Sequence, residues 1–252
     1  MIFNYSTYSN LVIIGDIHKK MSSIIKETTK YENTLFISTG DCLLGNHSFD
    51  YDIEMLENQH YSLLSKNNVL FIIRGNHDNP KYFKYDSTIR THLETYCPNI
   101  ILVPDYSIIK TQNHNILCIG GARTIDRTFK IKNIDWWQNE NVKTPEDKFF
   151  IQNQNIDIIV SHSGPLFGQP YEFSDQLKHY NSFIVNAYSL YDNKMKNDVY
   201  KERLLLKGIY EKLNNMHHIT HFIYGHYHKS IEMGYCKTRC ISLGLGEFKQ
   251  IV

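Results

Sequence analysis

The feature that most constrains how this chain can fold is an apolar run that stops abruptly at a polar turn. Residues 69–73 read Val-Leu-Phe-Ile-Ile, and residues 74–80 read Arg-Gly-Asn-His-Asp-Asn-Pro. A short β-branched and aromatic run bounded by Gly, Asn and Pro is typical of a buried strand followed by a loop. The sequence therefore predicts a strand whose carboxyl end carries Asn76, His77 and Asp78.

The same pattern, an apolar run followed by Asp or His in a turn, recurs at four other places. These turns are Gly15-Asp16-Ile17-His18, Gly40-Asp41, Ser161-His162 and Gly225-His226-Tyr227-His228. Asp16 and His18 are two residues apart, so on an extended backbone their side chains would point to the same side. A carboxylate and an imidazole on one side form half of a divalent metal site. Any one of these turns also fits an ordinary loop, so the argument depends on the whole set.

Regular elements are expected between these turns. Apolar runs predict further strands at 11–14, 34–38, 100–103, 106–110, 115–119, 156–160, 221–224 and 239–243. Apolar periodicity and helix-start signals predict helices over 21–31, 51–66, part of 82–96, a segment starting at 144–147, and 198–214. Successive strands without intervening helices indicate an antiparallel section. Residues 166–198 fit no clear element and are expected to form an insertion over the site.

Composition limits the class of protein. The chain has 252 residues, 42% hydrophobic and 21% charged, which suits a single domain over 1–252. The net charge of +1 gives no strong nucleic-acid signal. The five cysteines form no evident disulfide framework, and the N-terminus lacks the features of a signal peptide. No apolar run is long enough to span a membrane. A cytoplasmic location is therefore expected, while the sequence indicates no oligomeric state.

The order and spacing of the five turns closely resemble the signatures of the calcineurin-like metallophosphoesterase superfamily, from about residue 11 to residue 246. The resemblance implies an α/β fold in which two mixed β-sheets form a four-layer sandwich flanked by helices. By motif position, it also implies two divalent transition metal ions. One ion would be held by Asp16, His18 and His228, the other by Asn76, His162 and His226, and Asp41 would bridge them. Such donors suit Mn, the first candidate, and also Fe, Zn or Co, better than Ca.

The resemblance implies hydrolysis of a phosphomonoester or phosphodiester by attack of metal-bound hydroxide. His77 would be the acid that protonates the leaving oxygen, a role that suits an imidazole. Asp78 either orients His77 or caps the next turn, and the cap is favoured. Arg74 matches an arginine that grips phosphate in phosphoprotein phosphatases, and a buried structural ion pair is its alternative role.

Departures from the family pattern narrow the range of expected substrates. Lys19 stands where the family usually has Gly, and Leu44 stands where phosphoprotein phosphatases carry an Asp, with no Arg following. A dedicated phosphoserine/threonine phosphatase is therefore disfavoured. Arg123 or Arg127 is a hypothetical replacement for the missing phosphate clamp. Two alternative functions stay open, a catalytically silent binding scaffold of the same fold and a nuclease acting with a partner, although near-neutral net charge argues against the nuclease.

Overall fold

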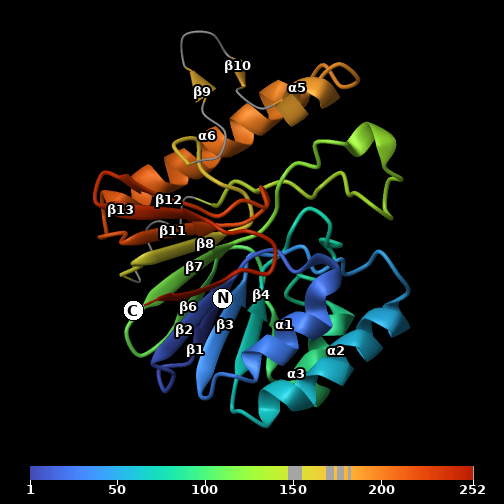
Figure 1. The fold of residues 1–252 in the computed structure, drawn as a ribbon, viewed down its shortest axis with the longest axis vertical. Helices are drawn as coiled ribbons and strands as arrows, with labels where there is room; N and C mark the ends of the chain where they lie inside the picture. The colour runs from blue at the N-terminus through green and yellow to red at the C-terminus, as the bar shows by residue number, and fades with distance from the viewer. Residues whose placement is uncertain (147–154, 169–172, 175–178, 181–182, 252) are drawn as a thin grey trace.

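Two β-sheets pack face to face, and helices cover the outer face of each sheet (Figure 1). The computed structural model describes residues 1–146, 155–168, 173–174, 179–180 and 183–251. The predicted fold class, two mixed sheets in a sandwich flanked by helices, is confirmed. The predicted helix start at 144–147 runs into residues 147–154, which lie outside the described residues, and residues 144–146 are not helical.

The first sheet has five strands. In spatial order they are β14 (Phe248–Ile251), β2 (Asn10–Ile14), β3 (Thr34–Ser38), β4 (Val69–Ile72) and β5 (Ile100–Leu102). Strands β2 to β5 are parallel, and β14 pairs antiparallel with β2. Three helices pack on its outer face: α1 (Met21–Thr28), α2 (Phe49–Leu64) and α3 (Thr88–Tyr96). The parallel pairing brings the carboxyl ends of β2, β3 and β4 to one edge of the sheet.

The second sheet has seven strands. Their order is β1 (Ile2–Asn4), β6 (Ser107–Lys110), β7 (Asn115–Ile119), β8 (Ile158–Ser161), β11 (His221–Tyr224), β13 (Thr238–Ser242) and β12 (Ile231–Tyr235). Strands β7, β8, β11 and β13 are parallel, while β6 and β12 pair antiparallel with β7 and β13. The expected antiparallel section is therefore present at β6 and β7. Helix α6 (Met195–Asn214) covers the outer face of this sheet.

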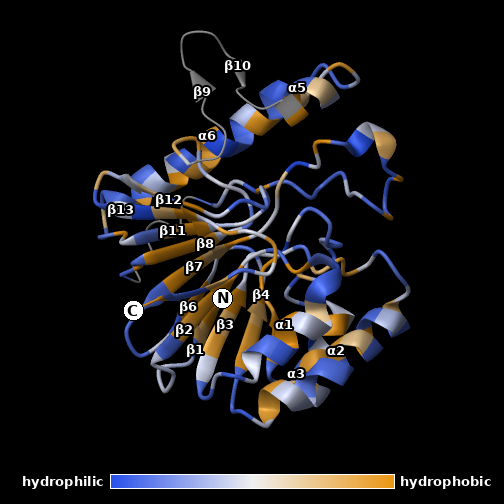
Figure 2. Ribbon diagram, in the orientation of Figure 1, coloured by the Kyte–Doolittle hydropathy of each residue, from blue (hydrophilic) through white to orange (hydrophobic). Residues whose placement is uncertain are grey.

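Alternating side chains of the buried strands divide the core into layers. In β2, Leu11 and Ile13 pack between the two sheets, while Val12 and Ile14 pack toward the helices on the other face. This two-residue alternation is the normal geometry of a strand. Figure 2 shows the resulting concentration of hydrophobic residues on the strands and on the inner faces of α1 to α3. Because both faces are covered, these strands read as continuous apolar runs in the sequence.

Some element boundaries differ from the sequence prediction. The helix expected within 82–96 begins only at residue 88, because the side chain of Ser87 caps it by accepting a hydrogen bond from the backbone N–H of Arg90. Strand β1 was not predicted, and it is held by parallel pairing with β6. Residues 166–198 contain short elements in their described parts: β9 (Phe173–Ser174), β10 (His179–Tyr180), α5 (Phe183–Tyr188) and the start of α6.

Two other sequence expectations concern cysteines and membranes. All five cysteines are free thiols, in agreement with the absence of a predicted disulfide framework. Among the described residues, no helix combines the length and the apolar character that crossing a bilayer requires.

Candidate metal centre

The predicted ligand turns lie at the carboxyl ends of five strands, three in one sheet and two in the other. Asp16 and His18 follow β2, Asp41 follows β3, and Asn76 follows β4. His162 follows β8, and the segment containing His226 and His228 follows β11. Within the first sheet, the backbone N–H of His18 donates to the carbonyl of Asp41 at 2.6 Å. Between the two sheets, the backbone N–H of His226 donates to Asp16 Oδ2 at 2.7 Å. Residues separated by more than two hundred positions therefore meet at one edge of the fold.

The first cluster of candidate ligands contains Asp16, His18, Asp41 and His228, whose ligand atoms all lie within 4.8 Å of one another. The Nε2 atoms of His18 and His228 are 3.0 Å apart. His18 Nε2 is 3.5 Å from Asp41 Oδ2, and His228 Nε2 is 3.3 Å from Asp16 Oδ2. Two imidazole nitrogens and two carboxylate oxygens form a donor set that suits a divalent transition metal.

A second cluster adjoins the first and shares Asp41 with it. His162 Nε2 lies 2.9 Å from Asn76 Oδ1 and 3.4 Å from Asp41 Oδ2, and the rings of His162 and His226 are 5.1 Å apart. His162 Nδ1 lies 2.7 Å from the carbonyl oxygen of Thr39, which can only accept, so Nδ1 donates the proton. In the neutral tautomer Nε2 then presents a lone pair to the cluster, as in a metal-ligating histidine.

Burial and the close charges of carboxylates and imidazoles shift the pKa values of the candidate ligands. Burial alone would raise the pKa of the Asp41 carboxyl, but the charges of His162, His77 and His18 outweigh burial and lower it. Burial lowers the pKa of His162, but the carboxylates of Asp41 and Asp16 outweigh burial and raise it. Burial, assisted by the charge of His162, lowers the pKa of His226 well below its usual value. Metal binding requires ionised carboxylates and neutral imidazoles. The shifts of Asp41 and His226 favour this state, whereas the raised pKa of His162 means that a metal ion must compete with a proton there.

The backbone bends sharply at four of the candidate ligands. His18, Asp41, His226 and His228 have φ values of 45°, 55°, 66° and 54°, in the left-handed region that non-glycine residues rarely adopt. Such conformations cluster at functional sites, where the surrounding structure holds them. The sequence argument for Asp16 and His18 assumed extended backbone, and that assumption was wrong, because Ile17 is helical with φ −80° and ψ −46°. The two side chains converge because of the bend at His18.

Residues that the sequence reasoning did not single out hold the candidate ligands in place. Thr39 Oγ1 donates to Asp16 Oδ1 at 2.9 Å, and Asn76 Nδ2 donates to Thr124 Oγ1 at 3.0 Å. Thr124 in turn donates through its hydroxyl to the buried carboxylate of Glu140 at 2.8 Å. Burial raises the pKa of Glu140 to about 7, although hydrogen bonds from Thr124 oppose the rise. These contacts fix the orientation of both ligand side chains.

A sequence model of the calcineurin-like phosphoesterase family matches residues 9–230. The chain belongs to this family. Among solved structures, the protein TT1561 of Thermus thermophilus is similar with a TM-score of 0.55 at 9% identity, covering 94% of this chain and 89% of that chain. Phosphopantetheinyl hydrolase from Mycobacterium tuberculosis has a TM-score of 0.48 at 12% identity, covering 96% and 95%. No curated protein matches the chain. Family membership, with the cluster of candidate ligands, supports a metal-dependent phosphoesterase.

Two glycines of the family's turns allow the backbone to approach the carboxylates. A Cβ at Gly75 would lie 2.0 Å from Asp41 Oδ1 and 2.4 Å from the Asp41 backbone nitrogen. A Cβ at Gly225 would lie 1.9 Å from Asp16 Oδ1. Any other residue at these positions would displace a candidate ligand.

We therefore expect Gly75→Ala to weaken metal binding. The displaced Asp41 carboxylate should lower the affinity for Mn²⁺ by about 10- to 100-fold, the usual cost of disturbing the support of a ligand. Calorimetric titration of the metal-free protein measures this change. Gly208→Ala is the matched control, because nothing lies within 4 Å of a Cβ at that position in α6. Equal affinities of the two variants would contradict the role given to Gly75.

His77 and Asp78 differ in what they contact. His77 lines the cavity beside the cluster, its ring lies 5.6 Å from that of His18, and its backbone N–H donates to Asp41 Oδ1 at 2.9 Å. The carboxylate of Asp78 accepts from the N–H groups of Gly75 at 2.8 Å and Leu44 at 3.0 Å. Burial and the Asp41 charge raise the pKa of Asp78 to about 6. Asp78 therefore joins its own turn to the loop after β3, and these two bonds are not to the next turn that it was expected to cap.

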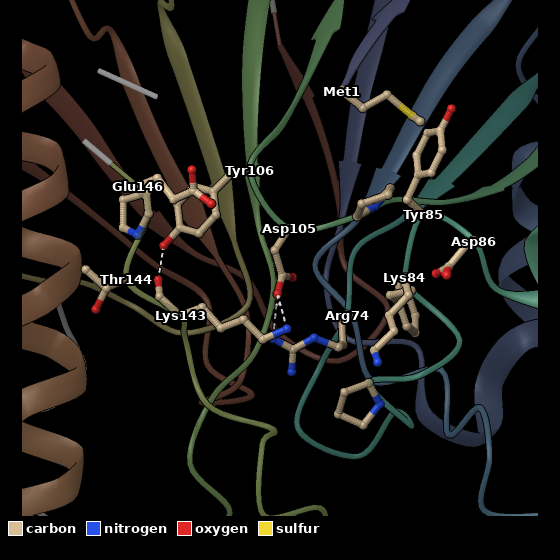
Figure 3. A pocket seen from close by; sticks show the side chains of 14 residues that line it. Met1, Arg74, Lys84, Tyr85, Asp86, Asp105, Tyr106, Lys143, Thr144 and Glu146 are labelled. Carbon is tan, nitrogen blue, oxygen red and sulfur yellow. Dashed lines mark hydrogen bonds and ion pairs between the residues drawn. The ribbon is translucent and has the colours of Figure 1, made fainter. Parts of the chain in front are cut away.

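Arg74 occupies a different place from the one that substrate binding would require. Its guanidinium is 1% exposed and donates to Asp105 Oδ2 at 3.0 Å, to the carbonyl of Gly120 at 3.2 Å and also to the carbonyl of Glu140. Figure 3 shows it with Asp105 beside a separate cavity of about 650 Å³, which none of the seven candidate metal ligands lines. Of the two roles considered for Arg74, this geometry supports the buried ion pair, and the substrate-binding role stays a prediction.

The two other arginines considered for substrate binding, Arg123 and Arg127, also interact with carboxylates of the protein. Arg127 is held by Asp192 and Asp198, with Nε–Oδ2 and Nη2–Oδ2 distances of 2.6 and 2.9 Å. These ion pairs favour a structural role for Arg127, and its role as a phosphate clamp stays a prediction. Arg123 is half-buried, and burial raises the pKa of nearby Glu202 against the opposing charge of Arg123. Arg123 does not line the cavity beside the cluster, so its role in substrate binding stays a prediction.

Proposed function

We propose that this chain hydrolyses phosphate esters with two divalent cations, Mn²⁺ being the first candidate. The first cation would be held by Asp16, His18, Asp41 and His228, and the second by Asp41, Asn76, His162 and His226. One observation carries the proposal: the same carboxylate oxygen, Asp41 Oδ2, lies 3.5 Å from His18 Nε2 and 3.4 Å from His162 Nε2. A carboxylate that faces two imidazoles from two strand ends supports a bridging role.

The side chains of the chain account for binding and proton transfer. When bound, the cations would supply a water of lowered pKa and positive charge for the phosphoryl oxygens. The buried Asp16 and Asp41 carboxylates supply the negative charge that retains cations, and the neutral imidazoles supply lone pairs. His77 lines the cavity but does not contribute to the first cluster, which supports its role as the proton donor to the leaving oxygen.

We expect the effect of His77→Gln to depend on the leaving group. For an alkyl phosphate, whose alkoxide leaves poorly unless protonated, kcat should fall by about 10²-fold, the lower end of the range for general acid catalysis. For p-nitrophenyl phosphate, whose phenolate leaves without a proton, kcat should change little. His92→Gln is the control, because His92 bonds Glu57 at 2.6 Å away from the cluster. Equal losses on both esters would show that His77 has another role.

The proposed function is tested by metal replacement. The protein is stripped with a chelator, reloaded separately with Mn²⁺, Fe²⁺, Zn²⁺ or Co²⁺, and its bound metal is counted. Each form is assayed with p-nitrophenyl phosphate, its bis ester, a cyclic nucleotide and a phosphopeptide. Two ions per chain and metal-dependent hydrolysis are expected. A chain that binds fewer than two ions and hydrolyses none of these esters would instead favour a binding scaffold.

A further inference from the structure

A cavity of about 240 Å³ adjoins the candidate metal centre, and the candidate ligands Asp41, Asn76, His226 and His228 form part of its lining. His77, His226 and His228 contribute polar atoms to its lining. The apolar part of its lining, here called the apolar wall, is formed by Ile125, Ile184, Val185, Tyr188 and Val199. This wall comes from the loop after β7, from α5 and from the first turns of α6, and none of the predicted metal ligands belongs to it.

The apolar wall is fixed by packing of its own. Val185 and Val199 form a small buried cluster with Met195, and Ile125 packs against this cluster. The ion pairs of Arg127 join the Ile125 loop to the chain on either side of the start of α6. Phe129 contacts the ring of Tyr188, with centroids 6.0 Å apart. Because these contacts hold α5 against the loop, the wall is a built surface at the reaction site.

The size of the cavity limits what can occupy it. Its volume corresponds to roughly eight water molecules at about 30 Å³ each. That is below the range of about 300–1,000 Å³ typical of sites for drug-sized ligands. A phosphate with a compact alcohol fits such a volume, whereas a nucleoside or a peptide chain would extend out of the cavity and leave much of its surface off the apolar wall.

The charge of the cavity limits the chemistry of the leaving group. Among its described lining residues there is no lysine or arginine, and Asp126 adds a carboxylate on the side of the wall. A second anionic group on the substrate would face this carboxylate and the apolar side chains without a partner. Leaving a charged group without a partner in an apolar site is costly. An uncharged apolar group would instead gain by contacting the wall.

We propose that the wall formed by Ile125, Ile184, Val185, Tyr188 and Val199 selects phosphomonoesters of compact, uncharged, apolar or aromatic alcohols. Nucleotides and phosphopeptides are poor substrates, because they exceed the cavity and carry additional polar or charged groups. This inference rests on the proposed phosphoesterase function and names its substrate class.

The test compares two primary alkyl phosphates, benzyl phosphate and AMP, so that the reactivity of the leaving oxygen is matched. The Mn²⁺-loaded wild-type protein should prefer benzyl phosphate in kcat/KM by at least about tenfold. Ile184→Lys places a cation in the wall and removes apolar contact, so it should reduce that preference by about tenfold. Ile184 is 49% exposed, so the fold should accept the lysine. Leu190→Lys is the matched control, because Leu190 is 84% exposed and does not line the cavity.

A second variant protects the test against misfolding of the first. Tyr188→Ala should enlarge the cavity and raise kcat/KM for 2-naphthyl phosphate relative to phenyl phosphate. If hydrolysis occurs but AMP or a phosphoserine peptide is the better substrate, or if both wall variants keep the wild-type preferences, the inference is overturned and the phosphoesterase function stands. If no ester is hydrolysed with any of the four metals, the proposed function itself fails.

Discussion

Asp41→Asn is expected to reduce kcat/KM for phosphate esters by at least about a thousandfold. Loss of a single hydrogen-bond donor that stabilises transition-state charge already costs about 10²–10³ in rate, and this substitution disturbs both candidate cation sites. The variant keeps the Oδ1 acceptor that receives the N–H of His77 at 2.9 Å, so the turn is retained. The Oδ2 atom becomes an amide nitrogen without a lone pair, facing the Nε2 atoms of His18 and His162. Both ligand clusters therefore lose a donor through a single substitution.

The measurements for Asp41→Asn are steady-state kinetics and the number of metal ions bound per chain. We expect fewer than two ions to be retained after dialysis. Asp50→Asn is the matched control, because Asp50 lies exposed in the first turn of α2, away from the cluster. If Asp41→Asn kept two ions and near wild-type activity, the bridging role of Asp41 would be wrong, and with it the dinuclear arrangement.

Much of the fold and the candidate site could be predicted from local sequence. The run 69–73 and its counterparts are apolar because covered strands bury both faces, and this property is visible without a partner strand. That the polar residues after these runs meet was implied by the resemblance to the family. The structure supplies the physical reason, because parallel strands place their carboxyl ends at one edge. The convergence of Asp16 and His18 was predicted for an incorrect reason, since the left-handed bend at His18 is imposed by contacts with the Asp41 turn.

Contacts between distant residues account for what the sequence did not reveal. Thr124 and Glu140 support Asn76 from positions 48 and more residues away, and neither residue carries a local signal. The wall contributed by α5 depends on Val185 packing with Val199 and Ile125, in a region whose sequence is polar and without clear periodicity. The phosphate-binding role of Arg74 was inferred from its position before Gly75. The groups that its guanidinium contacts, Asp105 and the carbonyl of Gly120, lie more than thirty residues away in the sequence.

Arg74→Met is expected to destabilise the protein by about 3–5 kcal/mol, the usual cost of breaking a buried ion pair from one side. The substitution would leave the Asp105 carboxylate and the carbonyl groups of Gly120 and Asn141 without the guanidinium that now donates to them. Methionine has similar length but no donor, so no replacement bond can form. In a chain of this size the melting temperature should fall by roughly 6–20 °C.

Arg239→Met is the control for Arg74→Met, because it removes an ion-paired arginine that is exposed rather than buried. Arg239 pairs with Glu232, but its side chain is 57% exposed, so its loss should cost no more than about 1 kcal/mol. Thermal unfolding of both variants, with KM measured well below the transition, distinguishes the two roles of Arg74. A structural ion pair predicts lowered stability and a nearly unchanged KM. Wild-type stability with a raised KM would instead mean that Arg74 binds the phosphate. A residue that binds substrate stabilises mainly the enzyme–substrate complex, whereas a buried ion pair stabilises the folded protein itself.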